Sequence, residues 1–145
     1  MRMQKKNTDD LRQELMQAPN LDRFLSTNRE QFSNESLSES LNRLLGEKRI
    51  SKAALAKQAG MSEVYLHQIF AGRRNPSRNR LLCLCFGLEA SIDETQDLLK
   101  RCGLAQLYPK NKRDAIIYYG LVHKMSLPEL NDKLFAEEEE MLFDR

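Results

Sequence analysis

The sequence has few of the residues that build disulfide-linked, metal-binding or membrane-spanning proteins. Its 145 positions contain no tryptophan, three cysteines and two histidines, and only 7% of the residues are aromatic. An odd number of cysteines does not suit a disulfide framework. The longest apolar stretch, 81–88, is far shorter than the about 20 residues needed to cross a bilayer. We therefore expect no membrane span, no metal site and no bound cofactor.

The pair Cys83 and Cys85 resembles half of a metal site at first sight. Side chains two positions apart on a helix point about 200° away from each other, so they cannot share an ion while the helix persists. No second Cys or His pair follows at zinc-finger spacing. The sequence therefore predicts that both cysteines are small, buried core residues.

The motifs of common enzymes and of secreted proteins are also missing. There is no phosphate-binding loop, and two histidines at positions 67 and 123 define no catalytic pair. No apolar run follows the first residues, as it would in a secretory signal. We expect a protein without enzymatic activity that stays in the cytoplasm.

Helix-forming residues dominate the composition. Leu, Glu, Lys, Arg and Ala are abundant, whereas β-branched residues are scattered. Ser36, Ser91 and Ser126 are each followed three positions later by Glu, which is the pattern of a capping box at a helix start. These features predict an all-α fold.

The predicted starts and ends of helices divide the chain into three segments. Residues 1–35 are predicted to form an N-terminal helical arm, with one helix at about 9–17 and a short one after Pro19. Residues 36–103 are predicted to form the main domain. Residues 104–145 are predicted to be a C-terminal extension of two helices, about 112–123 and 126–138, with a solvated acidic tail.

The segment from Ser51 to Gly72 has the pattern of two helices joined by a tight turn. Ser51 and Ser62 are placed to cap the two helices. Gly60 permits a positive φ in the turn, and Ala56 is small enough for a close helix crossing. The second helix is expected to have two different faces, at about 100° per residue. Its inward arc is Tyr65, Leu66, Ile69 and Phe70, and its outward arc is Glu63, Val64, His67, Gln68 and Ala71.

These positions resemble the lambda-repressor-like (Cro/XRE) family of bacterial and phage helix-turn-helix transcriptional regulators. The resemblance covers about residues 37–99 and rests on Leu55-Ala56, Gly60-Met61-Ser62, Leu66, Ile69-Phe70 and the segment from Gly72 to Pro76. It implies a five-helix DNA-binding domain that binds double-stranded DNA as a homodimer, with the recognition helix 62–71 in the major groove.

The resemblance also implies which side chains contact the DNA. The expected base-reading residues are Lys52, Glu63, Val64, His67 and Gln68. The expected phosphate-contacting residues are Ser51, Ser62, Arg73, Arg74, Asn75 and Ser77. A carboxylate at Glu63 can accept a hydrogen bond from the cytosine amine, although phosphates repel it. His67 remains open between a base reader and a plain exposed side chain.

Charge is distributed unevenly along the chain. Between Arg43 and Arg80 there are nine basic and two acidic residues, a local formal charge of +7, whereas residues 126–145 carry −5. The basic segment coincides with the helix-turn-helix pattern, which favours DNA as the partner. Arg78 and Arg80 are interpreted as solvating the start of the next helix. Glu63 and the acidic tail keep open an alternative, namely a protein-interaction adaptor or antitoxin-like module. In that alternative a protein partner binds the N-terminal arm or the C-terminal helices.

Overall fold

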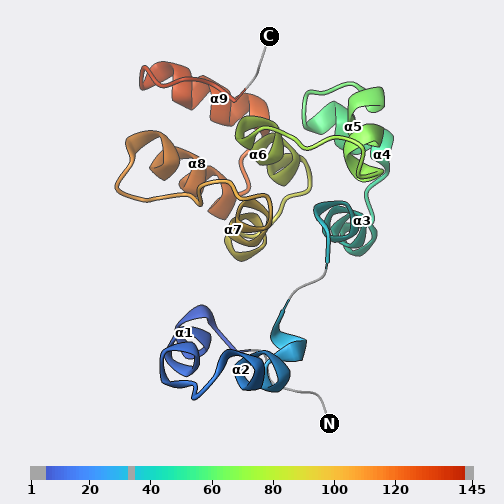
Figure 1. Ribbon diagram of the computed structural model, residues 1–145. Helices are drawn as coiled ribbons and strands as arrows, with labels where there is room; N and C mark the ends of the chain where they lie inside the picture. The colour runs from blue at the N-terminus through green and yellow to red at the C-terminus, as the bar shows by residue number, and fades with distance from the viewer. Residues whose placement is uncertain (1–5, 33–34, 143–145) are drawn as a thin grey trace. The chain divides into compact units, whose positions relative to one another are not determined.

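The computed structural model describes residues 6–32 and 35–142, and in these ranges all regular structure is helical (Figure 1). This confirms the all-α prediction. No helix in the described part of the chain is both long enough and apolar enough to span a bilayer. The elements are α1 (Thr8–Gln17), α2 (Leu21–Thr27), the 3-10 helix η1 (Arg29–Gln31), α3 (Leu37–Lys48), α4 (Lys52–Gln58), α5 (Glu63–Phe70), α6 (Arg78–Gly87), α7 (Ile92–Arg101), α8 (Lys112–Val122) and α9 (Leu127–Ala136).

The chain consists of two compact units, Met1–Glu35 and Ser36–Arg145. In the N-terminal unit α1 pairs with α2. The ring of Phe24 is buried and meets Phe32 edge-on, with 6.4 Å between the ring centroids. The buried amide of Asn28 donates to Glu14 and accepts from the ammonium of Lys6. A small apolar contact and a polar network thus hold this unit together.

Side-chain caps start the helices largely where the sequence predicts them. Ser91 and Ser126 form complete capping boxes. The hydroxyl of Ser36 accepts from the Glu39 amide at 3.1 Å, but the described contacts of this turn include no return bond from the Glu39 carboxylate, so that capping box is half formed. Asn7 caps α1, which therefore begins one residue earlier than predicted.

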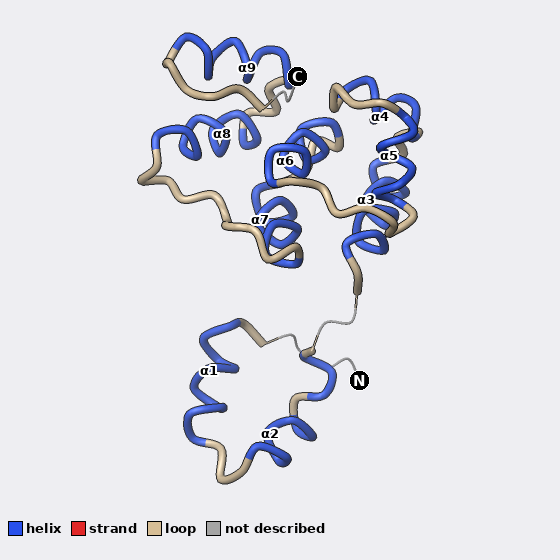
Figure 2. Tube along the Cα trace, turned by 45° about the horizontal axis from the view of Figure 1, so that its top comes forward, coloured by secondary structure: helices blue, strands red, loops and turns tan. Residues whose placement is uncertain are grey.

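Helix α6 lies at the centre of the C-terminal unit (Figure 2). It packs against α4, α7 and α9, and every residue from 81 to 88 is buried. The prediction that Cys83 and Cys85 are core residues is confirmed. Burial raises the pKa of the Cys85 thiol to about 12, so this thiol stays protonated at neutral pH.

Gly87, the last residue of α6, marks the closest approach between α6 and α4. A methyl group added there would lie 2.7 Å from Leu55 Cδ1 and 3.3 Å from Ala59 Cβ. We expect Gly87→Ala to lower the free energy of unfolding by about 1 kcal/mol, because overpacking exceeds the gain in helix propensity. Denaturant unfolding measures this change.

Gly46 provides the matched control for Gly87. It lies inside α3, and an added methyl group there would meet no atom within 4 Å. Gly46→Ala is therefore expected to raise the free energy of unfolding by up to about 1 kcal/mol. Equal stabilisation by both substitutions would contradict the close α4–α6 contact.

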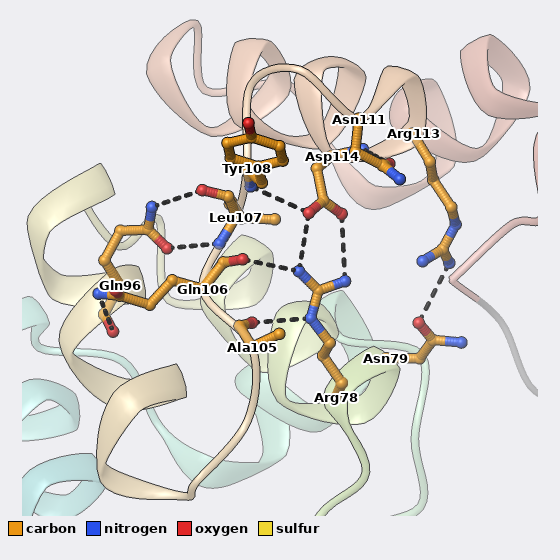
Figure 3. Close-up of polar contacts among 10 residues, drawn as sticks. All are labelled: Arg78, Asn79, Gln96, Ala105, Gln106, Leu107, Tyr108, Asn111, Arg113 and Asp114. Carbon is orange, nitrogen blue, oxygen red and sulfur yellow. Dashed lines mark hydrogen bonds and ion pairs between the residues drawn. The ribbon is translucent and has the colours of Figure 1, made fainter.

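A polar cluster joins the α8–α9 hairpin to α6 (Figure 3). The guanidinium of Arg78 donates to both carboxylate oxygens of Asp114, at 3.1 and 3.0 Å, and to the carbonyls of Ala105 and Gln106. The Tyr108 amide also donates to Asp114. Arg78 therefore does not merely solvate a helix start, as the sequence suggested, because it binds a carboxylate 36 positions away.

The described part of the acidic tail, 137–142, contacts the rest of the fold, which the expectation of a solvated terminus did not include. Arg113 donates to the carbonyls of Glu140 and Met141 and to the side chain of Asn79. The Glu137 carboxylate pairs with Lys112 and Lys133. A hydrogen bond and the charge of Lys112, followed by the charge of Lys133, lower the pKa of Glu137. These contacts hold the tail against the start of α8.

Candidate nucleic-acid interface

Helices α4 and α5 form the predicted pair around a tight turn. The hydroxyls of Ser51 and Ser62 accept from the amides of Ala54 and Tyr65, each at 3.1 Å, and so cap the two helices. Gly60 has a φ of 66°, the left-handed conformation that the turn was predicted to require. Ala56, on α4, is buried as predicted. Each of these local predictions is confirmed.

Helix α5 has the two faces that its sequence predicts. Leu66, Ile69 and Phe70 are at most 3% exposed and anchor the helix on the core. On the opposite face Glu63, Val64 and His67 are exposed, and Val64 reaches 69%. Gln68 is half-buried at the edge of that face. The outer surface of α5 is thus available to a partner.

The C-terminal end of α5 is fixed by α3. The Ser38 hydroxyl and the Asn42 amide both donate to the carbonyl of Phe70, at 2.8 and 3.0 Å. They satisfy a carbonyl that has no partner within its own helix. Sequence reasoning missed both residues, although their i, i+4 spacing places them on one face of α3. These two bonds tie the C-terminal end of α5 to α3.

Four of the six predicted phosphate contacts lie on the loop after α5. Arg73, Arg74, Asn75 and Ser77 are exposed around the buried Pro76. The Ser77 hydroxyl is already engaged, because it caps α6 by accepting from the Arg80 amide at 3.2 Å. The ammonium of Lys52, at the start of α4, lies 5.7 Å from the centroid of the Phe70 ring.

Residues 36–98 match the family model of a helix-turn-helix domain. The match begins at the cap of α3 and ends within α7, close to the limits that the sequence motif predicts. No curated protein and no solved structure was found to match the chain. Assignment to the lambda-repressor-like family in particular stays a prediction.

Ion pairs within the fold neutralise part of the positive charge of the helix-turn-helix domain. Arg43 pairs with Glu47, Lys48 with Glu94, and Arg78 with Asp114. Burial on its own raises the pKa of Glu94, but hydrogen bonds from Ser91 and Lys48 outweigh it and lower the pKa overall. Glu47 is already counted in the local +7, but Glu94 and Asp114 lie outside the segment, so +7 overstates the charge that a partner meets. Five further basic residues lie in α4, at its approach, or on the loop after α5: Arg49, Lys52, Lys57, Arg73 and Arg74.

The residues predicted to read bases or to contact phosphates thus lie on α5 or at its start, at the start of α4, or on the loop after α5. Lys52 and Ser51 lie at the start of α4, Ser62 and Glu63 at the start of α5, and the basic loop follows its end. Among the described residues no cluster of three His, Cys, Asp or Glu side chains could hold a metal ion.

Proposed function

We propose that the helix-turn-helix domain binds double-stranded DNA sequence-specifically and that the protein is a transcriptional regulator of the lambda-repressor-like kind. One observation carries the proposal: α5 buries one face against the core and presents the other to solvent, and a loop with the exposed Arg73 and Arg74 follows it. A helix placed in this way fits the major groove. This function requires no catalytic group and no cofactor. We expect the protein in the cytoplasm, bound to DNA in the nucleoid.

The exposed side chains of α5 have the chemistry that base reading uses. The Gln68 amide can donate to and accept from adenine, and Lys52 can donate to guanine. The Glu63 carboxylate can accept from the cytosine amine, and Val64 offers an apolar contact to a thymine methyl group. We assign His67 to the same surface because it is exposed one turn after Glu63.

The residues flanking α5 would hold the DNA backbone. Arg73 and Arg74 supply positive charge, and Asn75 and Ser77 supply polar groups on the same exposed loop. Ser51 and Ser62 stand at helix starts, where backbone amides favour a phosphate. Such contacts fix the position of the helix in the groove without reading sequence.

We further propose that the protein binds DNA as a homodimer on two half-sites. Large apolar side chains on α8 and α9 are exposed, with Tyr119 at 60% and Phe135 at 72%, and they supply a surface for the second copy. Light scattering of the purified protein distinguishes a dimer from a monomer. A monomer at the concentrations that saturate DNA would contradict this part of the proposal.

Selection from a pool of random duplexes tests the DNA-binding function. We expect the wild-type protein to enrich a sequence preference. We expect Arg73→Ala with Arg74→Ala to weaken binding to every duplex by a similar factor, because both arginines contact phosphates. The slope of log K against log salt concentration should become shallower by about 0.9 for each phosphate that the variant no longer neutralises. Unchanged affinity and slope would contradict the proposed backbone contacts.

Exposed apolar residues of the N-terminal unit support the second candidate, a protein-interaction adaptor or antitoxin-like module. Leu15 is 50% exposed, Met16 77% and Leu21 61%. Apolar side chains gathered on a small unit mark a surface for a protein partner. A stoichiometric native complex that Met16→Asp disrupts, together with no binding to any duplex, would favour this candidate over the DNA-binding one.

A further inference from the structure

We propose that Asp114 and Arg113, at the start of α8, are positioning residues for DNA binding. Both lie outside the helix-turn-helix match, which ends at residue 98. They hold the first turn of α6, where the loop with four of the proposed phosphate contacts ends. The inference rests on the proposed DNA binding and adds the C-terminal extension to it.

The first turn of α6 is fixed by the C-terminal extension at two successive residues (Figure 3). The guanidinium of Arg78 donates to both carboxylate oxygens of Asp114 and to the carbonyls of residues 105 and 106. The side chain of Asn79 accepts from the guanidinium of Arg113 at 3.1 Å. A bidentate pair of guanidinium and carboxylate permits one orientation, so it fixes direction as well as distance.

The loop between α5 and α6 is anchored at its two ends. At its start the Arg73 amide donates to the Gln68 carbonyl at 2.9 Å. At its end the Ser77 hydroxyl accepts from the Arg80 amide at 3.2 Å, which ties Ser77 to the first turn of α6. Residues 74–76 adopt no regular structure, and their course depends on where the two ends stand. A displacement of the first turn of α6 therefore moves the loop.

A second connection runs through the ring of Tyr65 on α5. The guanidinium carbon of Arg74, in the loop, lies 5.0 Å from the ring centroid. That of Arg80, in the first turn of α6, lies 5.2 Å from the same centroid. Tyr65 is half-buried and packs against the core. The loop, α5 and the first turn of α6 thus meet at one ring, so their relative positions are coupled.

A loop that is held in place before DNA arrives lowers the cost of binding. Each side chain that must be immobilised on association subtracts from the affinity. Arg78 and Asp114 neutralise each other, so the pair itself does not attract phosphate. Its contribution is positional, and it has the opposite sign to an electrostatic one. By charge alone, removal of a carboxylate from a DNA-binding domain strengthens the attraction to DNA.

Asp114→Asn tests the positioning role, because it removes the charge and keeps the size of the side chain. We expect the affinity for a duplex selected by the wild-type protein to fall about fivefold. The affinity for an unrelated duplex should fall by the same factor, because the loop contacts phosphates. Both proteins are compared at a temperature where circular dichroism shows them folded. Unchanged or higher affinity would contradict the role of Asp114.

Nuclear magnetic resonance order parameters separate positioning from a loss of stability alone. In the protein without DNA, the amides between residues 73 and 77 should have lower order parameters in Asp114→Asn than in the wild type. Those of α5 should not change. Weaker DNA binding with unchanged order parameters in the loop would overturn the positioning role.

Asn79→Ala is a second variant that alters no charge. It removes the acceptor of Arg113 on α6 and should lower the affinity about threefold, as for loss of one hydrogen bond. Asp132→Asn is the matched control, because it removes an exposed carboxylate from the same hairpin. Its affinity should equal or slightly exceed that of the wild type.

The outcomes distinguish this inference from the proposed function. Wild-type affinity in both Asp114→Asn and Asn79→Ala, with sequence-specific DNA binding intact, would overturn the positioning role alone. A wild-type protein that binds no duplex would overturn the positioning role and the proposed function together.

Discussion

Replacing Asp114 by alanine is expected to lower the free energy of unfolding by about 3 kcal/mol, because it leaves the guanidinium of Arg78 without its carboxylate in a largely buried site. The Asp114 side chain is 10% exposed and that of Arg78 24%. The same carboxylate also accepts from the Tyr108 amide in the segment that leads to α8. The substitution therefore loosens the attachment of the α8–α9 hairpin to α6. Denaturant unfolding followed by circular dichroism measures the loss.

Glu47→Ala is the control for the buried pair. Its partner is Arg43, one turn away on α3, and both side chains are about half exposed. We expect this substitution to lower the free energy of unfolding by about 0.5 kcal/mol or less, as for other exposed ion pairs. If Asp114→Ala and Glu47→Ala lower the free energy of unfolding by the same amount, the attachment of the α8–α9 hairpin does not depend on the buried pair.

The second large effect is expected on DNA specificity. His67→Ala combined with Gln68→Ala should lower the affinity for the selected duplex about a hundredfold, since one well-placed base contact discriminates by about 1–3 kcal/mol. Affinity for unrelated duplexes should change little, because the phosphate contacts remain. Equilibrium binding of both kinds of duplex at one salt concentration measures the two affinities.

Gln13→Ala is the control for the base-reading variant, because it truncates an exposed glutamine on α1. It should leave both affinities unchanged. A double variant that weakens binding to both duplexes equally would show that these two side chains do not read bases.

Local chemistry made most of the helix-turn-helix domain predictable. Ser51 and Ser62 act through hydroxyls that reach amides three positions away. Gly60 adopts the one conformation that the turn demands. The burial of Leu66 and its neighbours follows from helical periodicity. These features depend on residues close in sequence, and a sequence pattern shows them directly.

The contacts that the sequence did not reveal join residues far apart along the chain. Arg78 binds Asp114 across 36 positions, and Ser38 caps the Phe70 carbonyl across 32. In a sequence, an arginine that solvates a helix start looks the same as one that binds a buried carboxylate. Only the packing of α6 against the C-terminal helices distinguishes the two cases, and that packing involves the whole core.

The same limit applies to the candidate interface. Its exposed helix face was predictable from periodicity, but the meeting of Arg74 and Arg80 over Tyr65 was not. The local charge of +7 counted residues by sequence position. The fold shows that Lys48 and Arg78 are engaged with carboxylates outside the counted segment. The remaining positive charge is therefore smaller than the count along the sequence suggested.

The ratio of affinities for a selected duplex and a shuffled duplex of the same composition tests the central claim most directly. With the wild-type protein at physiological salt, sequence-specific binding by α5 predicts a ratio of about 1,000 or more. Equal affinities for the two duplexes, or no binding to either, would contradict a sequence-specific DNA-binding function for this helix-turn-helix domain.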